Sequence, residues 1–146
     1  MQLPAAGAAA SCRGNPDIQL GSSDELHVEG HTFRAWAMDA TDINDVRNGY
    51  DFLLQKDCFS NAAHTPYAFT IKNRNNQAFD NFESDSDSFS GLNILKALKT
   101  KQAENKAVFM THNMIPGATP LTAKKRQEAI SSVVAGSLLC LENIAV

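Results

Sequence analysis

Apolar and polar residues alternate in the segment from His27 to Met38. Successive side chains of a strand point to opposite faces, so this alternation predicts a strand with one buried face. The positions assigned to the buried face are Phe33, Ala35 and Ala37, and those assigned to the outer face are Thr32, Arg34 and Trp36.

A helical pattern follows this strand. Thr41 is a suitable N-cap, and Asp42 and Asp45 favour the first turn of a helix because they complement its dipole. Apolar residues then recur at helical spacing and predict one buried stripe, formed by Ile43, Val46, Tyr50, Leu53 and Leu54.

The middle of the chain predicts a hairpin and a second helix. Tyr67–Ile71 and Ala78–Glu83 are strand-like, and the asparagines between them tolerate the positive φ that a tight turn requires. A polar loop over residues 84–91 follows, and Ser90 can cap a helix there. The buried stripe of this helix is Leu92, Ile94, Leu95 and Leu98.

The last third predicts one more strand and a final helix. Ala107–Thr111 is a continuous apolar run, as in a central strand. Thr119 and Pro120 have the order of an N-cap and a first helical residue. The helix that they begin is expected to run to about Leu141, with a buried stripe at Ile130, Val133, Val134, Leu138 and Leu141.

The predicted order of elements is β-α-β-β-α-β-α. This order fits an α+β two-layer sandwich, in which helices cover one face of a four-stranded sheet. Residues 1–25 contain Pro, Gly, Ser, Ala and Asn without a periodic apolar pattern, and we interpret them as a flexible leader. The folded domain is therefore expected to span residues 26–146, as one domain.

Composition narrows the class of protein. The chain is 43% hydrophobic and 20% charged, which is typical of a soluble globular domain. No apolar run approaches the ~18 residues that a membrane span needs, and Met1–Ala10 lacks the basic start of a secretory signal. The cysteines, Cys12, Cys58 and Cys140, are odd in number and lack metal-ligand spacing, so we expect reduced thiols in a cytoplasmic protein.

The net charge of −3 conceals an asymmetry, because residues 1–90 carry −7 and residues 91–146 carry +4. An anionic partner would be attracted only to the second part. RNA binding through the phosphate backbone is therefore one alternative function. Its candidate contacts are Lys96, Lys99, Lys124, Lys125 and Arg126.

The sequence contains no familiar catalytic or metal-binding motif. His27 and His31 are four residues apart, but they lie on or before a strand and no third ligand has suitable spacing. The acidic run over residues 83–87 lacks the glycine and the terminal glutamate of a calcium loop. A Gly-x-Ser-x-Gly elbow and a phosphate-binding glycine loop are also missing. We therefore expect a protein that is not an enzyme and that uses no metal and no small-molecule cofactor.

Four segments, in one order, resemble those of a known family. Residues 62–71, Ala-Ala-His-Thr-Pro-Tyr-Ala-Phe-Thr-Ile, are similar to an Ala-Ser/Thr-His-x-x-Tyr-Ala-Tyr-x-Ile strand of the Impact/YigZ family, the UPF0029 domain. Residues 32–35 are similar to its Ser-x-Phe-x-Ala opening strand, residues 83–91 to its acidic segment and following glycine, and residues 107–112 to its Val-Val-Val-Ser-Arg strand. The resemblance covers about residues 30–142.

The resemblance is that of a diverged member. The family's Arg-x-x-Gly-Gly-x-x-Leu-Gly signature is replaced by residues 112–121, in which Gly117 is the one retained glycine. The acidic motif keeps three of its four acids. The positions that match family motifs are His64, Tyr67, Glu83, Asp85, Asp87, His112 and Gly117.

Membership of this family implies a fold like the second domain of ribosomal protein S5 and a role in translation control. The family's eukaryotic members restrain the amino-acid-starvation kinase by occupying its ribosome-bound coactivator. We therefore expect a regulatory or adaptor domain in stress-responsive control of initiation, with a translation-associated protein or the ribosome as partner. Two alternatives stay open, namely RNA binding and a small enzyme with its site at His64, Asp85 and Asp87.

Overall fold

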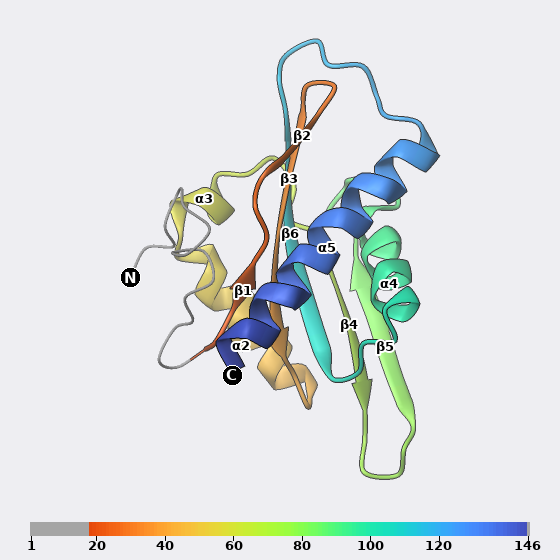
Figure 1. The fold of residues 1–146 in the computed structure, drawn as a ribbon. Helices are drawn as coiled ribbons and strands as arrows, with labels where there is room; N and C mark the ends of the chain where they lie inside the picture. Colours follow the sequence, from red (N-terminus) through yellow and green to blue (C-terminus); the bar gives the residue numbers. More distant parts are fainter. Residues whose placement is uncertain (1–17, 146) are drawn as a thin grey trace.

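An antiparallel sheet forms the centre of the molecule (Figure 1). The computed structural model describes residues 18–145. Strands β3 (His31–Asp39) and β6 (Lys106–Met114) pair along their whole length, from His31 opposite Met114 to Asp39 opposite Lys106. The strand order is β1-β3-β6-β4-β5, and β2 also pairs with β3.

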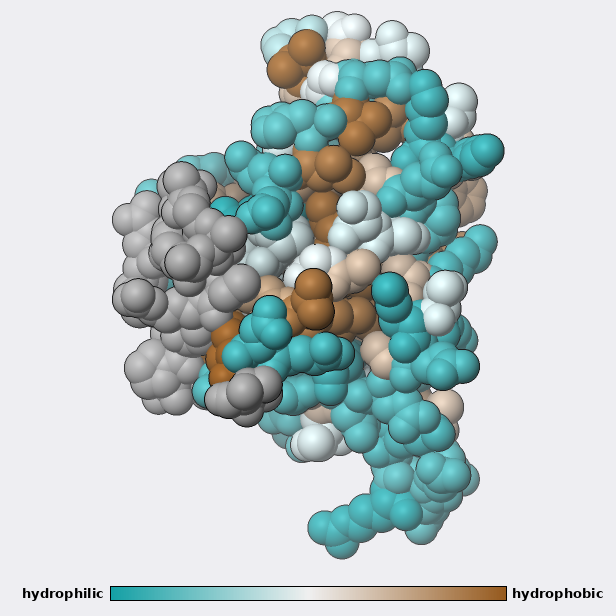
Figure 2. All heavy atoms as spheres, viewed as in Figure 1, coloured by the Kyte–Doolittle hydropathy of each residue, from teal (hydrophilic) through white to brown (hydrophobic). Residues whose placement is uncertain are grey.

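The predicted hairpin is confirmed. Strands β4 (Tyr67–Lys72) and β5 (Ala78–Glu83) pair in antiparallel register, and β4 lies between β5 and β6 as an inner strand. The turn is held by the Asn73 side chain, whose Oδ1 accepts from the backbone N–H groups of Asn75 and Gln77. Figure 2 shows that hydrophilic residues cover this projecting hairpin at the bottom of the view, whereas hydrophobic residues gather over the middle and upper part of the face.

Helices cover both faces of the sheet, so the predicted two-layer arrangement with helices on one face is wrong. Helices α4 (Ser90–Thr100) and α5 (Ala123–Ala145) cover the face that carries Phe33. Helices α2 (Ile43–Leu54) and α3 (Asp57–Ser60) cover the opposite face, where an aromatic core forms around Trp36, Phe59, Phe69 and Phe109.

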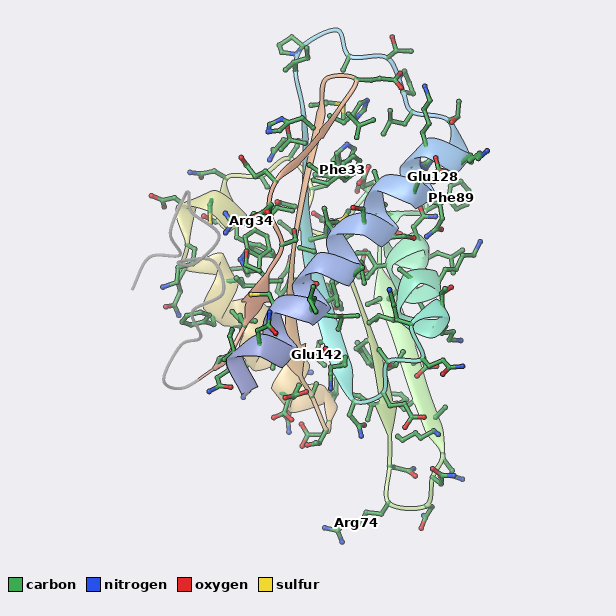
Figure 3. The ribbon with its side chains drawn as sticks, in the orientation of Figure 1. Phe33, Arg34, Arg74, Phe89, Glu128 and Glu142 are labelled. Carbon is green, nitrogen blue, oxygen red and sulfur yellow. The ribbon has the colours of Figure 1, made fainter. Side chains whose placement is uncertain are left out.

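Two residues of β3 explain the error. Arg34 and Trp36 were expected to face solvent, but both are buried. The guanidinium of Arg34 lies 4.9 Å from the Trp36 ring centroid and donates to the Ser22 hydroxyl, which makes its burial tolerable. Figure 3 shows Arg34 on the side of α3 and Phe33 on the side of α5.

The sheet has six strands rather than four because two short strands pair with the outer edge of β3. These are β1 (Gly21–Ser22) and β2 (Leu26–Val28). Strand β1 falls within the expected leader, so the ordered domain begins before residue 26. The rest of the expected leader, residues 1–17, lies outside the described residues.

Strand β1 packs against the last helix at very close range. A Cβ at position 21 would overlap the backbone of Leu141, so only glycine fits there. Leu20, next to it, is fully buried among the aromatic residues of the α2 and α3 face.

Three helix starts differ from the predicted caps. Asp42, not Thr41, caps α2 by accepting from the backbone N–H of Asp45. Helix α5 begins at Ala123 rather than after Thr119, and the hydroxyl of Thr122 accepts from the N–H of Lys125. Helix α4 is preceded by Phe89 in the left-handed conformation, and Ser90 is its first residue.

The last helix continues to Ala145, beyond the predicted end at Leu141. Buried apolar positions such as Ile130 and Val134 alternate along it with polar ones. Within residues 18–145, no helix is long and apolar enough to cross a membrane.

One of the two described cysteines differs from the expectation of reduced thiols. Cys140 is disulfide-bonded, whereas Cys58 is free and exposed. A disulfide is uncommon in a reducing compartment, so the cysteines no longer support the cytoplasmic location that they were taken to indicate.

Candidate functional site

A chain of buried polar side chains lies at the upper end of the sheet, where β6 ends and β3 begins. His112 Nδ1 lies 2.8 Å from Asp87 Oδ2, and His112 Nε2 lies 2.8 Å from His31 Nδ1. His31 Nε2 lies 2.8 Å from the backbone oxygen of Thr119, in the loop before α5. The exposed fractions of His31, His112 and Asp87 are 3%, 5% and 9%.

Strand register brings the two histidines together. His112 faces Phe33 across the β3–β6 pair, and His31 is two residues before Phe33, so both imidazoles lie on the α5 side of the sheet. The Phe33 ring stacks on His112 with centroids 4.4 Å apart. Asp87 reaches them from the loop before α4, and the Ser90 hydroxyl donates to its Oδ2 at 2.6 Å.

The number of hydrogen bonds determines the total charge of Asp87, His112 and His31. Three hydrogen bonds link Asp87, His112, His31 and the Thr119 carbonyl, and each bond needs one proton. Two neutral imidazoles supply only two protons. The third proton is held either by the Asp87 carboxyl group or by an imidazole. In both cases the total charge of the three side chains is zero.

The surroundings of Asp87 lower the pKa of its carboxyl group. Burial alone would raise the pKa of Asp87, but the hydrogen bonds from His112 and Ser90 and the charges of His112 and His64 hold that pKa below its ordinary value. Asp87 is therefore ionised and accepts hydrogen bonds from both His112 and Ser90.

A second cluster adjoins the first and contains two more family-motif residues. Asp85 Oδ2 accepts from the backbone N–H and the hydroxyl of Thr65, at 2.7 and 3.1 Å. His64 Nδ1 lies 3.1 Å from the Asp85 backbone oxygen, and the backbone of His64 pairs with that of His112. The structure thus brings together His64, Asp85, Asp87 and His112, which are distant in sequence.

The other three family-motif residues lie apart from this cluster or at its edge. Glu83 accepts from the backbone N–H of Asp85 and so supports the loop. Tyr67 lies on the opposite face of the sheet against Tyr50, and burial raises its pKa. Gly117 is in the loop before α5 with φ +81° and open space around it.

A pocket of about 320 Å³ lies beside the histidines. Apolar side chains form part of its wall, and the polar part is formed by His31, His112, Asp87, Ser86, Ser88 and Arg126. The Arg126 guanidinium donates from one amino group to the backbone oxygen of Ser88 at 2.8 Å. The pocket is therefore bounded by the loop before α4, the loop before α5 and the first turn of α5.

The candidate RNA contacts are not all available for phosphate. Lys99 pairs with Asp80 at 3.6 Å, Lys125 pairs with Glu29, and Arg126 binds the Ser88 carbonyl. Lys96 and Lys124 are exposed. RNA binding through these residues stays a prediction.

The contacts of His31 and His112 bear on metal binding and acid–base chemistry at these two residues. Within the described part of the chain, no three His, Cys, Asp or Glu side chains are grouped to hold a metal ion. Both nitrogens of His31 and of His112 already have protein partners. An imidazole can take a proton from a substrate only through a free nitrogen, so each would first have to break an internal bond.

His31 is the residue that sequence reasoning missed. It was considered only with His27, whose ring lies near the Thr32 hydroxyl on the surface. The position of His31 at the start of its strand was the signal that could have identified it. When β3 and β6 pair in antiparallel register, residue 31 lies near the end of the strand that carries His112.

No protein-family model and no curated protein matches this chain. Solved structures share its fold, and two of them illustrate the likeness. One, described as the crystal structure of a hypothetical protein, has a TM-score of 0.66 and 11% identity, over 82% of this chain and 57% of the other. The second is the two-domain translational regulator Yih1, with a TM-score of 0.57 and 19% identity, over 82% of this chain and 46% of the other. The chain therefore has the fold of these two structures and spans about half the length of each.

Proposed function

We propose that this chain is a diverged Impact-type domain that regulates translation as a non-catalytic binding module. The observation that carries this proposal is the fold that it shares with Yih1 over 82% of its length. The partner we propose is a translation-associated protein or the ribosome, in the cytoplasm and in stress-responsive control of initiation.

The chemistry of the site supports binding rather than catalysis. Both imidazole nitrogens of His31 and of His112 are engaged in internal hydrogen bonds, and the carboxylates of Asp85 and Asp87 accept from protein groups. Such a network stabilises the conformations of the loops before α4 and α5. Rigid loops of this kind form a surface to which a partner can bind without large ordering cost.

A cell-free translation system tests this function. Purified chain added at a micromolar concentration is expected to change the yield of a reporter mRNA, and to co-sediment with ribosomes or be recovered with initiation factors. The matched control is the same chain unfolded by heat and returned to the assay. An unchanged reporter yield, together with no co-sedimentation and no recovered factor, contradicts the proposal.

A further inference from the structure

The pocket beside His31 and His112 combines an unbalanced positive charge with an apolar interior. The three hydrogen bonds that join Asp87, His112, His31 and the Thr119 carbonyl need three protons, so the three side chains together contribute no net charge. Arg126 adds one positive charge to the same wall. Among residues 18–145, no carboxylate lies within ion-pair distance of its guanidinium.

The geometry of Arg126 leaves donors for a ligand. One amino group binds the Ser88 carbonyl, which fixes the guanidinium at the pocket rim. The planar guanidinium has five N–H donors, and such a group matches the two oxygens of a carboxylate. The first turn of α5 lies at the same place, and its dipole adds to the positive potential.

The remaining wall selects the rest of the ligand. Its apolar part is formed by Phe33, Met114, Ala118, Pro120 and Leu121. A volume of about 320 Å³ corresponds to roughly ten water molecules, so a compact body of about that many non-hydrogen atoms can enter. Arg126 adds one guanidinium to this wall, which matches one carboxylate on the ligand.

We propose that this pocket binds a monocarboxylate with a compact apolar body, the carboxylate contacting Arg126 and the apolar part packing on Met114 and Leu121. The ligand is either a free small acid or the terminal carboxylate of a peptide that ends in an apolar residue. This site is independent of the function in translation, because a partner can bind to another surface.

Histidine and amide NMR spectra of the intact chain, recorded during titration, test the site. Benzoate is the first probe and is expected to give saturable shifts of His31, His112 and residues 86–88, with a Kd of about 1 mM. Benzamide has the same shape without the charge and is expected to bind about tenfold more weakly or worse. Inorganic phosphate is expected to bind more weakly than benzoate, because it has no apolar body to pack against the apolar part of the wall.

N-acetyl-leucine and N-acetyl-leucinamide distinguish the two ligand sources. If N-acetyl-leucine binds more tightly than benzoate, and its amide does not, the source is a peptide terminus. If benzoate binds more tightly, the source is a free acid. Both outcomes support the carboxylate site.

Substitutions identify the charge that matters. Arg126→Gln is expected to weaken benzoate binding about tenfold, whereas Arg126→Lys, which keeps the charge, retains part of the affinity. Lys124→Gln is the matched control, because Lys124 is an exposed cation in the same turn, and it should leave the Kd within about twofold. An unchanged amide spectrum of each unliganded variant verifies its fold.

Equal affinity for benzoate and benzamide overturns the proposal, as does unchanged binding by Arg126→Gln. Shifts confined to residues outside the pocket, or no saturable shift at millimolar benzoate, also overturn it. None of these results depends on the translation assay, so failure of this site and failure of the proposed function are observed separately.

Discussion

The two ends of the sheet hold their charged side chains in different ways. At the upper end, His31, His112 and Asp87 are each less than one-tenth exposed and share one chain of hydrogen bonds. At the lower end, the ion pairs Lys72–Glu104 and Lys106–Asp39 join side chains in contact with solvent, each at 2.7 Å. Contacts of similar length at the two ends are therefore not expected to contribute equally to stability, because water can replace a lost partner only at the exposed end.

The largest effect is expected from His112→Ala. This substitution leaves Asp87 buried without its main partner and also removes the ring that stacks on Phe33. We expect the free energy of unfolding to fall by about 3 kcal/mol or more, as measured by urea denaturation. A loss below about 1 kcal/mol would show that water reaches Asp87, and the contrast between the two ends would not hold.

A smaller effect is expected from His31→Phe. The ring volume is kept, but the hydrogen bonds to His112 and to the Thr119 carbonyl are lost. We expect a loss of about 1–3 kcal/mol and faster hydrogen exchange at Ile115 and Ala118 in the loop before α5. His27→Phe is the control, since His27 is exposed, and it should change neither quantity measurably.

The pH dependence of stability is expected to reflect Asp87. Its pKa in the folded state lies below the ordinary value of 3.8, so the unfolded chain takes up the proton first as the pH falls. The stabilisation is complete well above pH 3.8 and is lost as the pH falls through that value towards the folded-state pKa. Asp87→Asn removes this component, so the stability difference between wild type and variant should shrink on acidification. A constant difference from neutral to acid pH would contradict this assignment.

The smallest effects are expected at the lower end of the sheet. Lys72→Ala and Lys99→Ala each remove one exposed ion pair, and each should cost less than about 1 kcal/mol. The cost should diminish further in high salt, which screens exposed charges. If either variant loses as much free energy of unfolding as His112→Ala, the exposed ion pairs contribute as much to stability as the buried hydrogen bonds, and the contrast between the two ends is wrong.

Local patterns were sufficient to predict most individual elements. The strand-like segments Tyr67–Ile71 and Ala78–Glu83, with the asparagines between them, predicted a hairpin that the structure contains. Strand β1 was missed because two residues, Gly21 and Ser22, are too few to show a period. The second helical layer was missed because Arg34 looks like a solvent-facing residue, and only its contacts with Trp36 and Ser22 make it a core residue.

Only part of the site could be predicted, because some of its contacts depend on the tertiary fold. The resemblance identified His64, Asp85, Asp87 and His112, which the fold does bring together. His31 lies 81 residues from His112 in the sequence, and no spacing rule connects residues across strands whose pairing is unknown. Arg126 was identified only as a member of a basic run, because its position at the pocket rim depends on where α5 begins.

The contact between Gly21 and Leu141 has a practical consequence for anyone who shortens this protein. A fragment that begins at residue 26, where periodic patterning starts, would lack the strand that fits against the last helix. The outer edge of β3 at Trp36 and Ala37 and the backbone near Ser137 and Leu141 would then be uncovered, and unpaired strand edges promote aggregation. Recombinant fragments of this domain should therefore begin before Leu20. The insolubility of a shorter fragment would say nothing about the function of the intact chain.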